Sequence, residues 1–213
     1  MVLVASVLLF GCASHPFERH QPQQMPALTA EQLVDNWWLE AGRRYLCRHS
    51  GLLEVFMRKV ALEGVVKIDT TKQTARLVAM DTMGVKLFDL FVTKQSHQLN
   101  YLLPVLEEHP QLPKMVAQSL RAIFLQPNPS AQDRLIRRER RSVLKSDDGG
   151  SFEFIGMPVR LNRKIVDSKT NSWNVEYNQY LDQEGLWAPT GIVLNDDSGF
   201  RLTLWIQEIR ELQ

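Results

Sequence analysis

The stretch from Gly51 to Pro104 alternates in polarity with a period of two, and this pattern constrains the fold more than any other feature. Its apolar-alternating runs are residues 53–58, 62–68, 76–80 and 85–88. The polar turn sequences D-T-T-K at 69–72 and D-T-M-G at 81–84 separate successive runs. Such a series predicts an antiparallel meander. Several runs are apolar on both faces, which predicts a sheet whose concave side is covered or filled.

Two helical segments flank this meander. Thr29 and Gln32 form a capping box, T-A-E-Q, which predicts the start of a helix. Apolar residues then recur every four positions through Tyr45, with Trp37 and Trp38 adjacent, so we predict an amphipathic helix of about 16 residues. The two Trp residues fit either plain core packing or a cover over a cavity. Helical spacing returns in the second half of 104–125.

The strands expected after this segment are 134–144, 152–156, 159–166, 173–180, 192–195 and 200–209. An order of helix, about four strands, helix and about six strands predicts an α+β fold with one long antiparallel sheet. No internal repeat divides the chain, so residues 29–213 are expected to form a single domain.

The first twelve residues are typical of a bacterial lipoprotein signal. An apolar run, Val2 to Phe10, is followed by Gly11 and Cys12. We predict cleavage after residue 11 and acylation of Cys12, whose acyl chains would hold the protein on a membrane. The basic residues expected at the start of such a signal are missing, so the alternative is a short apolar N-terminus with a chance Cys. Residues 12–28 are predicted to be a flexible tether, rich in Pro, Gln and His.

The charge balance excludes one large class of partner. The sequence has 25 basic and 24 acidic residues, a formal charge of +1, which gives no bulk attraction to nucleic acid. With Cys12 acylated, Cys47 has no partner for a disulfide and is expected to be a buried small hydrophobe. The five His residues are scattered, and we predict no metal site and no cofactor.

The chain as a whole resembles the LolA/LolB superfamily and, within it, the DUF3261 family of outer-membrane lipoproteins. The resemblance rests on the signal, tether and helix, and on the stretches G-V-K-L-F-D-L at 84–90, W-A-P-T-G-I-V-L at 187–194 and F-R-L-T-L-W-I-Q-E-I at 200–209. It implies an incomplete antiparallel β-barrel of about 10–11 strands, its concave apolar face closed by helices. It also implies a non-enzymatic role in carrying acyl chains of lipoproteins, or a fatty-acid-like or polyene-like lipid, on the periplasmic face of the outer membrane. The absence of Asp at Ala13 fits that destination, and a periplasmic LolA-like carrier is the implied partner.

A site that accepts an acyl chain needs apolar area more than polar groups, because each CH₂ removed from water contributes about 0.8 kcal/mol. The candidate lining residues come from one face of the strands and from the two helices, and each one taken singly also fits ordinary core packing. They are Trp37, Trp38, Val55, Met57, Val66, Leu77, Leu87, Phe91, Leu120 and Phe124. The superfamily comparison also suggests Met83, in the 81–84 turn, as an exposed apolar residue that meets the membrane.

Catalytic signals are weak. The sequence lacks the common hydrolase, zinc-protease and phosphate-loop motifs. Glu107, Glu108 and His109 lie in a Pro-bounded loop without a further partner. Cys47 and His49 share the spacing of a nucleophile and its base on an extended strand, but nothing marks a third group. An envelope hydrolase is therefore the third-ranked hypothesis.

The densest charge cluster is R-L-I-R-R-E-R-R at 134–141. Arg137, Arg138, Arg140 and Arg141 are candidates for contact with lipid headgroups, because guanidinium pairs with phosphate in a bidentate manner. The alternative is an edge strand kept soluble by its charge. A wider alternative for the protein is a structural lipoprotein that docks an envelope partner on its sheet and holds no ligand.

Overall fold

A single antiparallel sheet contains every strand of the chain's described part. The computed structural model describes residues 15–18, 23–55, 58–167 and 172–212. The strands are β1 Arg44–Val55, β2 Arg58–Asp69, β3 Thr74–Met80, β4 Lys86–Val92, β5 His97–Leu102, β6 Arg134–Arg138, β7 Arg141–Lys145, β8 Gly150–Ile155, β9 Arg160–Val166, β10 Trp173–Gln183, β11 Leu186–Asp196 and β12 Arg201–Leu212. The predicted antiparallel meander is confirmed as β1 to β5.

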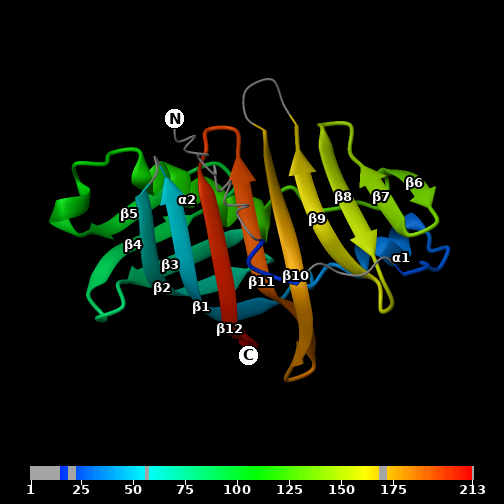
Figure 1. Cartoon of the computed structure of the whole chain (residues 1–213), viewed down its shortest axis with the longest axis horizontal. Helices are drawn as coiled ribbons and strands as arrows, with labels where there is room; N and C mark the ends of the chain where they lie inside the picture. The colour runs from blue at the N-terminus through cyan, green and yellow to red at the C-terminus, as the bar shows by residue number, and fades with distance from the viewer. Residues whose placement is uncertain (1–14, 19–22, 56–57, 168–171, 213) are drawn as a thin grey trace, which may run out of the picture.

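The sheet has 12 strands in the order β5-β4-β3-β2-β1-β12-β11-β10-β9-β8-β7-β6 (Figure 1). The first five strands and the last seven spread in opposite directions from a centre where β1 pairs with β12. The ends of the sheet, β5 and β6, are not paired with each other, so the barrel is unclosed as expected. The expected count of 10–11 strands was too low, because β5 was not expected as a strand and because 134–144 is a hairpin in which Arg138 pairs with Arg141.

The first helix is much shorter than predicted. The capping box is confirmed, with Thr29 and Gln32 bonding each other's backbone, but α1 spans only Ala30–Val34. The side chain of Asn36 donates to the Gln32 carbonyl at 2.6 Å, and the chain then turns away. This turn lets Trp38, only 3% exposed, enter the core, while Tyr45 begins the alternating burial of β1. Burial of large side chains outweighs the helical periodicity here.

A second helical segment covers part of one face of the sheet. It consists of η1 Pro104–Leu106, α2 Leu112–Leu120 and the π-helical turn η2 Arg121–Leu125. In Figure 1, α2 lies behind the strands. Its buried residues, including Ala117, continue into Ile123 of η2. We call the sheet face against α2 and η2 the inner face, and the opposite one the outer face; helical cover of the inner face is therefore partial.

The N-terminal residues described, 15–18, lie against the outer face. The Phe17 ring is 5% exposed and packs 5.8 Å from the ring of Trp205. Its position requires Gly191, since a Cβ there would lie 2.5 Å from Phe17 Cε1. His15 pairs with Glu176 at 2.9 Å. Part of the segment expected to be a tether is thus packed on the sheet, whereas the predicted signal and Cys12 lie outside the described residues.

Candidate functional site

The space between the inner face and the α2–η2 lid is nearly filled. It contains a cavity of about 30 Å³. The lining residues are His49, Leu53, Leu62, Val66, Leu77, Phe88, Val116, Ser119, Leu120, Ile123, Phe124, Phe200, Leu202 and Leu204. Such a volume accepts a water-sized molecule and is far below the several hundred Å³ of a typical ligand site. The inner face is apolar, but in this state it is closed.

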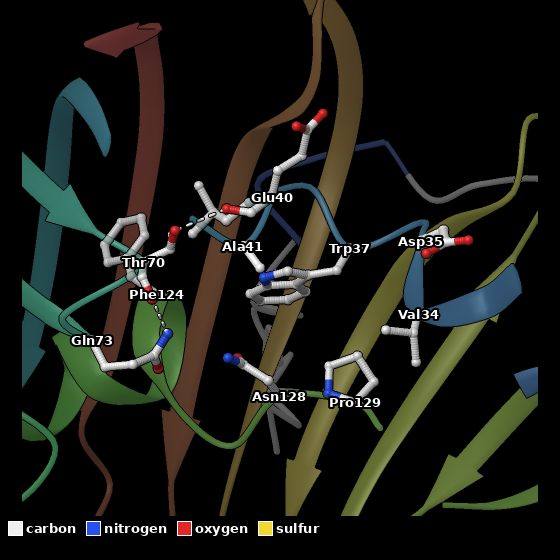
Figure 2. Close-up of a pocket in the computed structure, with 11 residues that line it drawn as sticks. Val34, Asp35, Trp37, Glu40, Ala41, Thr70, Gln73, Phe124, Asn128 and Pro129 are labelled. Carbon is white, nitrogen blue, oxygen red and sulfur yellow. Dashed lines mark hydrogen bonds between the residues drawn. The ribbon is translucent and has the colours of Figure 1, made fainter. Parts of the chain in front are cut away.

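A larger pocket of about 430 Å³ opens beside this cavity, at the other side of η2 (Figure 2). Trp37 stands at its centre, with Asn128 and Pro129 on one wall. Thr70 donates to the Glu40 carbonyl at 2.9 Å, which ties the β2–β3 turn to the loop after α1. The residues that complete the lining are Val34, Asp35, Leu39, Ala41, Gln73 and Phe124.

Phe124 is the side chain shared by the pocket and the cavity. It lines both of them and is itself 2% exposed. The ring therefore forms the partition between the half-polar pocket at the surface and the apolar inner face.

Lys164 is buried in the inner face close to the pocket. The residue is 0% exposed, and its cross-strand neighbours Phe152 and Val175 are fully buried and apolar. Nζ donates to the Pro127 carbonyl at 3.0 Å and lies 5.0 Å from the centroid of the Trp37 ring. No carboxylate of the described residues lies within ion-pair distance of it. Burial lowers the pKa of Lys164 to about 7.

Aromatic rings surround this lysine. Trp37 packs 6.0 Å from both Trp38 and Tyr177, and Trp38 packs 6.0 Å from Phe124. The Tyr177 hydroxyl donates to the Ile123 carbonyl at 2.9 Å, which fixes η2 to β10. The buried indole N–H of Trp38 has no acceptor among the described residues. The cluster thus contains a second donor beside Lys164.

Cys47 and His49 do lie on one face of β1, but burial removes the chemistry that their spacing suggested. Burial raises the pKa of the Cys47 thiol to about 12 and lowers the pKa of His49 to about 4. A neutral thiol beside a neutral imidazole is not an activated nucleophile. The described residues also contain no group of three or more His, Cys, Asp or Glu that could hold a metal ion.

Six of the predicted cavity residues meet at this site. Val66, Leu77, Leu120 and Phe124 line the small cavity, Trp37 lines the pocket, and Trp38 is buried in the ring cluster between them. Val55 is half-buried at the far end of β1, and Met57 lies outside the described residues. The position of Leu87 and Phe91 differs from the prediction.

The residues of β4 that face inward are the opposite alternate set to the one that we predicted. Phe88 points to the inner face and lines the cavity, whereas Phe91 pairs with Arg76 on the outer face. Leu87 is half-buried and lines neither space. Asp89 shares the phase of Leu87 and Phe91 and forms an ion pair with Arg76 at 2.7 Å. This carboxylate, which must face water or a cation, was the sequence signal for the correct phase.

Sequence reasoning also missed residues that the structure places at the site. Lys164 was not among the predicted site residues; of the adjacent basic residues Arg163 and Lys164, Arg163 lies on the outer face and pairs with Glu176. Other missed lining residues are Phe200, just before β12, and on the strands His49, Leu53, Leu62, Phe88, Leu202 and Leu204. On β12 the lining residues Leu202 and Leu204 are two positions apart, and this alternation of leucines is visible in the sequence.

The arginine cluster lies at the β6 end of the sheet. Arg138, Arg140 and Arg141 line an open pocket of about 660 Å³ together with Arg160 and Arg163. Arg137 instead donates to the Leu28 carbonyl at 2.9 Å. Because β6 is an edge strand, its charges fit protection of the edge as well as contact with anions. Met83, at the β3–β4 turn, is 85% exposed.

The architecture has solved counterparts. A LolA superfamily protein from Nitrosomonas europaea matches with a TM-score of 0.57 at 11% identity, over 88% of this chain and 96% of that one. A domain named for outer-membrane lipoprotein sorting from Vibrio parahaemolyticus matches with a TM-score of 0.49 and 8% identity, over 86% and 91% of the two chains. A DUF1329 family protein from Desulfovibrio piger matches with a TM-score of 0.48 and 6% identity, over 85% of this chain and 89% of that one.

The first of these matches shows that the chain has a LolA-like fold: an open antiparallel sheet with few helices. No family model matches the sequence, and no curated protein sequence matches it either. Among the described residues, no helix is both long and apolar enough to cross a membrane.

Proposed function

We propose that the protein is a non-enzymatic carrier or acceptor that binds an acyl-chain amphiphile between the inner face of its sheet and the α2–η2 lid. One observation carries the proposal: the apolar cavity at the inner face and a surface pocket of about 430 Å³ share the buried ring of Phe124 as a lining residue. The LolA-like fold supports it, because the matching protein from Nitrosomonas europaea is named for that superfamily.

The closed inner face determines how binding proceeds. The cavity of about 30 Å³ cannot hold an acyl chain, so the lid must move away from the strands as the chain enters. A sixteen-carbon chain gains on the order of 12 kcal/mol on leaving water completely. Part of that free energy is available to displace α2 and η2, since the chain replaces the apolar contacts that these elements lose.

The remaining predictions extend this proposal. Cys12 is the proposed acylation site and the outer membrane is the proposed location, with the sheet on the periplasmic side. A LolA-like carrier is the proposed partner, and exposed Met83 is the proposed residue that enters the bilayer. The finer resemblance to the DUF3261 family, and fatty-acid-like or polyene-like cargo, remain predictions.

The test is lipid analysis of the full chain, purified in mild detergent from its own envelope. We expect a stoichiometric amphiphile in the organic extract, identified by mass spectrometry. Leu202→Glu places a charge in the small cavity at a half-buried position and should abolish co-purification. Phe91→Glu is the matched control, because Phe91 is also half-buried but lies on the outer face.

The filled inner face also favours a second function, a scaffold that docks an envelope partner and holds no ligand. A scaffold predicts no co-purifying amphiphile and no uptake of fatty acids, lysolipids or acylated peptides by the folded chain. That combination would contradict the carrier proposal. Loss of the amphiphile in both the Leu202 and the Phe91 variants would also contradict it, since it would place the bound lipid outside the inner face.

A further inference from the structure

Lys164 is a cation placed where the fold offers it no anion. Asp89, another buried ionisable side chain, pairs with Arg76 at 2.7 Å, whereas Lys164 has no carboxylate partner among the described residues. A lysine ammonium carries three donors. One goes to the Pro127 carbonyl, and the Trp37 ring faces the charge. Two donors therefore remain for a partner that the described residues do not supply.

An unpaired buried charge is unfavourable, and burial lowers the pKa of this lysine to about 7 as a result. A methionine or leucine at the same position would satisfy packing between Phe152 and Val175 without that cost. The lysine is thus unnecessary for the fold of the inner face. An anion brought in by a ligand would form charge-assisted hydrogen bonds with it in a site that excludes water.

The position of Lys164 fits a ligand that enters through the pocket of Figure 2. Trp37, which lies 5.0 Å from Nζ, is the central ring of that pocket. Pro127, the acceptor of the Nζ hydrogen bond, immediately precedes Asn128 in the pocket wall. The ammonium therefore lies close to the pocket wall, next to the Trp37 ring.

We propose that Lys164 binds the anionic headgroup, a carboxylate or a phosphate, of an amphiphile whose acyl chain passes Phe124 and lies along the inner face. This inference rests on the proposed function and specifies the class of cargo. The unpartnered Trp38 indole N–H lies in the same ring cluster and provides a further donor. A neutral headgroup oxygen could accept a hydrogen bond from these donors, but it would leave the ammonium charge without a counter-anion.

The test compares three sixteen-carbon probes on the full chain in nonionic micelles: palmitate, hexadecyl phosphate and hexadecanol. We expect wild-type protein to bind at least one of the anionic probes about tenfold or more tightly than hexadecanol, as a charge-assisted hydrogen bond implies. The anion that binds more tightly identifies the headgroup. In Lys164→Met this preference should disappear while the affinity for hexadecanol changes less than about twofold. With [1-¹³C]palmitate, the shift of the carboxylate resonance on binding should be lost in the variant.

Two results would overturn the inference in different ways. The first result is equal affinity of the wild-type chain for all three probes, which can be measured without any variant. It would contradict the headgroup site at Lys164 but would not contradict the carrier proposal. An anion preference that persists in Lys164→Met would place the anion at another cation. Failure of every probe to bind the folded wild-type chain would instead contradict the proposed function itself.

Discussion

At the scale of single residues, Lys164 gives the stability of the fold a defined pH dependence. Its pKa falls from 10.5 to about 7 on folding, so between these values the unfolded chain holds a proton that the folded chain has released. Stability therefore rises with pH from about 7 to 10.5, and the destabilisation is fully present below pH 7. We expect Lys164→Met to raise the free energy of unfolding at pH 6 by on the order of 3–5 kcal/mol.

Urea unfolding between pH 6 and 10 measures this effect. The curve of stability against pH should be flatter in Lys164→Met than in the wild-type chain. Lys67→Met is the control, because Lys67 is exposed on β2 and its removal should leave the slope unchanged. If the curves of stability against pH were parallel for wild type and Lys164→Met, folding would not lower the pKa of Lys164.

Gly64 shows how a residue without a side chain shapes the same face. It lies opposite His49 in the β1–β2 register, and a Cβ at Gly64 would lie 2.7 Å from both Cε1 and Nε2 of that ring. The imidazole is 3% exposed and lies against this position of β2. We expect Gly64→Ala to destabilise the protein by about 1–3 kcal/mol through overpacking.

A double-mutant cycle with His49→Ala separates this clash from a general loss of strand flexibility. The cost of Gly64→Ala, measured by urea unfolding, should fall to well under about 1 kcal/mol when the ring is absent. An equal cost in both backgrounds would assign the effect to the backbone of β2 instead.

The sequence predicts which side chains face inward where one of the two alternate sets of residues in a strand is clearly polar, and it predicts this poorly elsewhere. Val66 and Leu77 were found because charged residues alternate with them on β2 and β3. On β4 each set of alternate residues is apolar apart from one charged side chain, Lys86 in one and Asp89 in the other, and the prediction followed the wrong set. Lys164 was beyond prediction, since a lysine in a strand with Asn162 and Arg163 gives the pattern of a solvated face. Only the fold reveals that it is buried against Trp37 and the Pro127 carbonyl.

At the scale of elements, polar contacts hold the lid on both halves of the sheet. Arg121, at the start of η2, donates to the Thr93 and Ser96 carbonyls at 2.7 and 2.6 Å, and Tyr177 holds the Ile123 carbonyl from the other side. Burial lowers the pKa of Arg121, which stays charged at any physiological pH. These hydrogen bonds therefore hold the lid on the apolar inner face, and single substitutions can remove them.

We expect Arg121→Ala to loosen the lid without unfolding the sheet. Backbone amides of α2 and η2 should exchange hydrogen about tenfold faster, as the loss of hydrogen bonds to a charged group implies, while β1 and β12 keep their protection. Hydrogen-exchange mass spectrometry measures both regions in one experiment. Arg43→Ala is the control, because its pair with Glu211 lies at the sheet and away from the lid. Equal exchange of α2 in both variants would show that packing alone holds the lid.

The elements themselves differ in how far local sequence determines them. The second helical segment was predicted because Pro residues and apolar spacing mark it independently of its surroundings. The first was overestimated in length, since its fourfold spacing continues through residues that the fold uses otherwise: Trp37 in a pocket and Tyr45 in β1. The hairpin of β6 and β7 turns at Glu139 and Arg140, a pair without turn-forming residue types.

At the scale of the whole molecule, the contact of Phe17 with Gly191 controls how far the sheet can stand from its proposed anchor. With Cys12 acylated and Phe17 docked, five residues connect the membrane to the outer face, a reach of about 17 Å at most. Phe17→Ser removes the ring that holds the segment, and it and the variants below are made together with His15→Ser, which removes the pair with Glu176. The next described backbone contact is Met25 N–H to the Glu139 carbonyl, so the reach should grow to about 45 Å.

Neutron reflectometry of the acylated chain on a supported bilayer measures this distance directly. We expect a thicker gap between bilayer and protein for Phe17→Ser, and the same change for Gly191→Ala, because a Cβ there occupies the place of the ring. Glu18→Ser, at the exposed neighbour of Phe17, should keep the wild-type gap. An unchanged gap in both the Phe17 and Gly191 variants would mean that the anchor reaches the sheet by contacts other than this ring. Phe17 lies in the N-terminal segment and Gly191 lies in β11, and both substitutions act on the contact between these two residues. Agreement between the two variants would therefore assign the spacing to that contact.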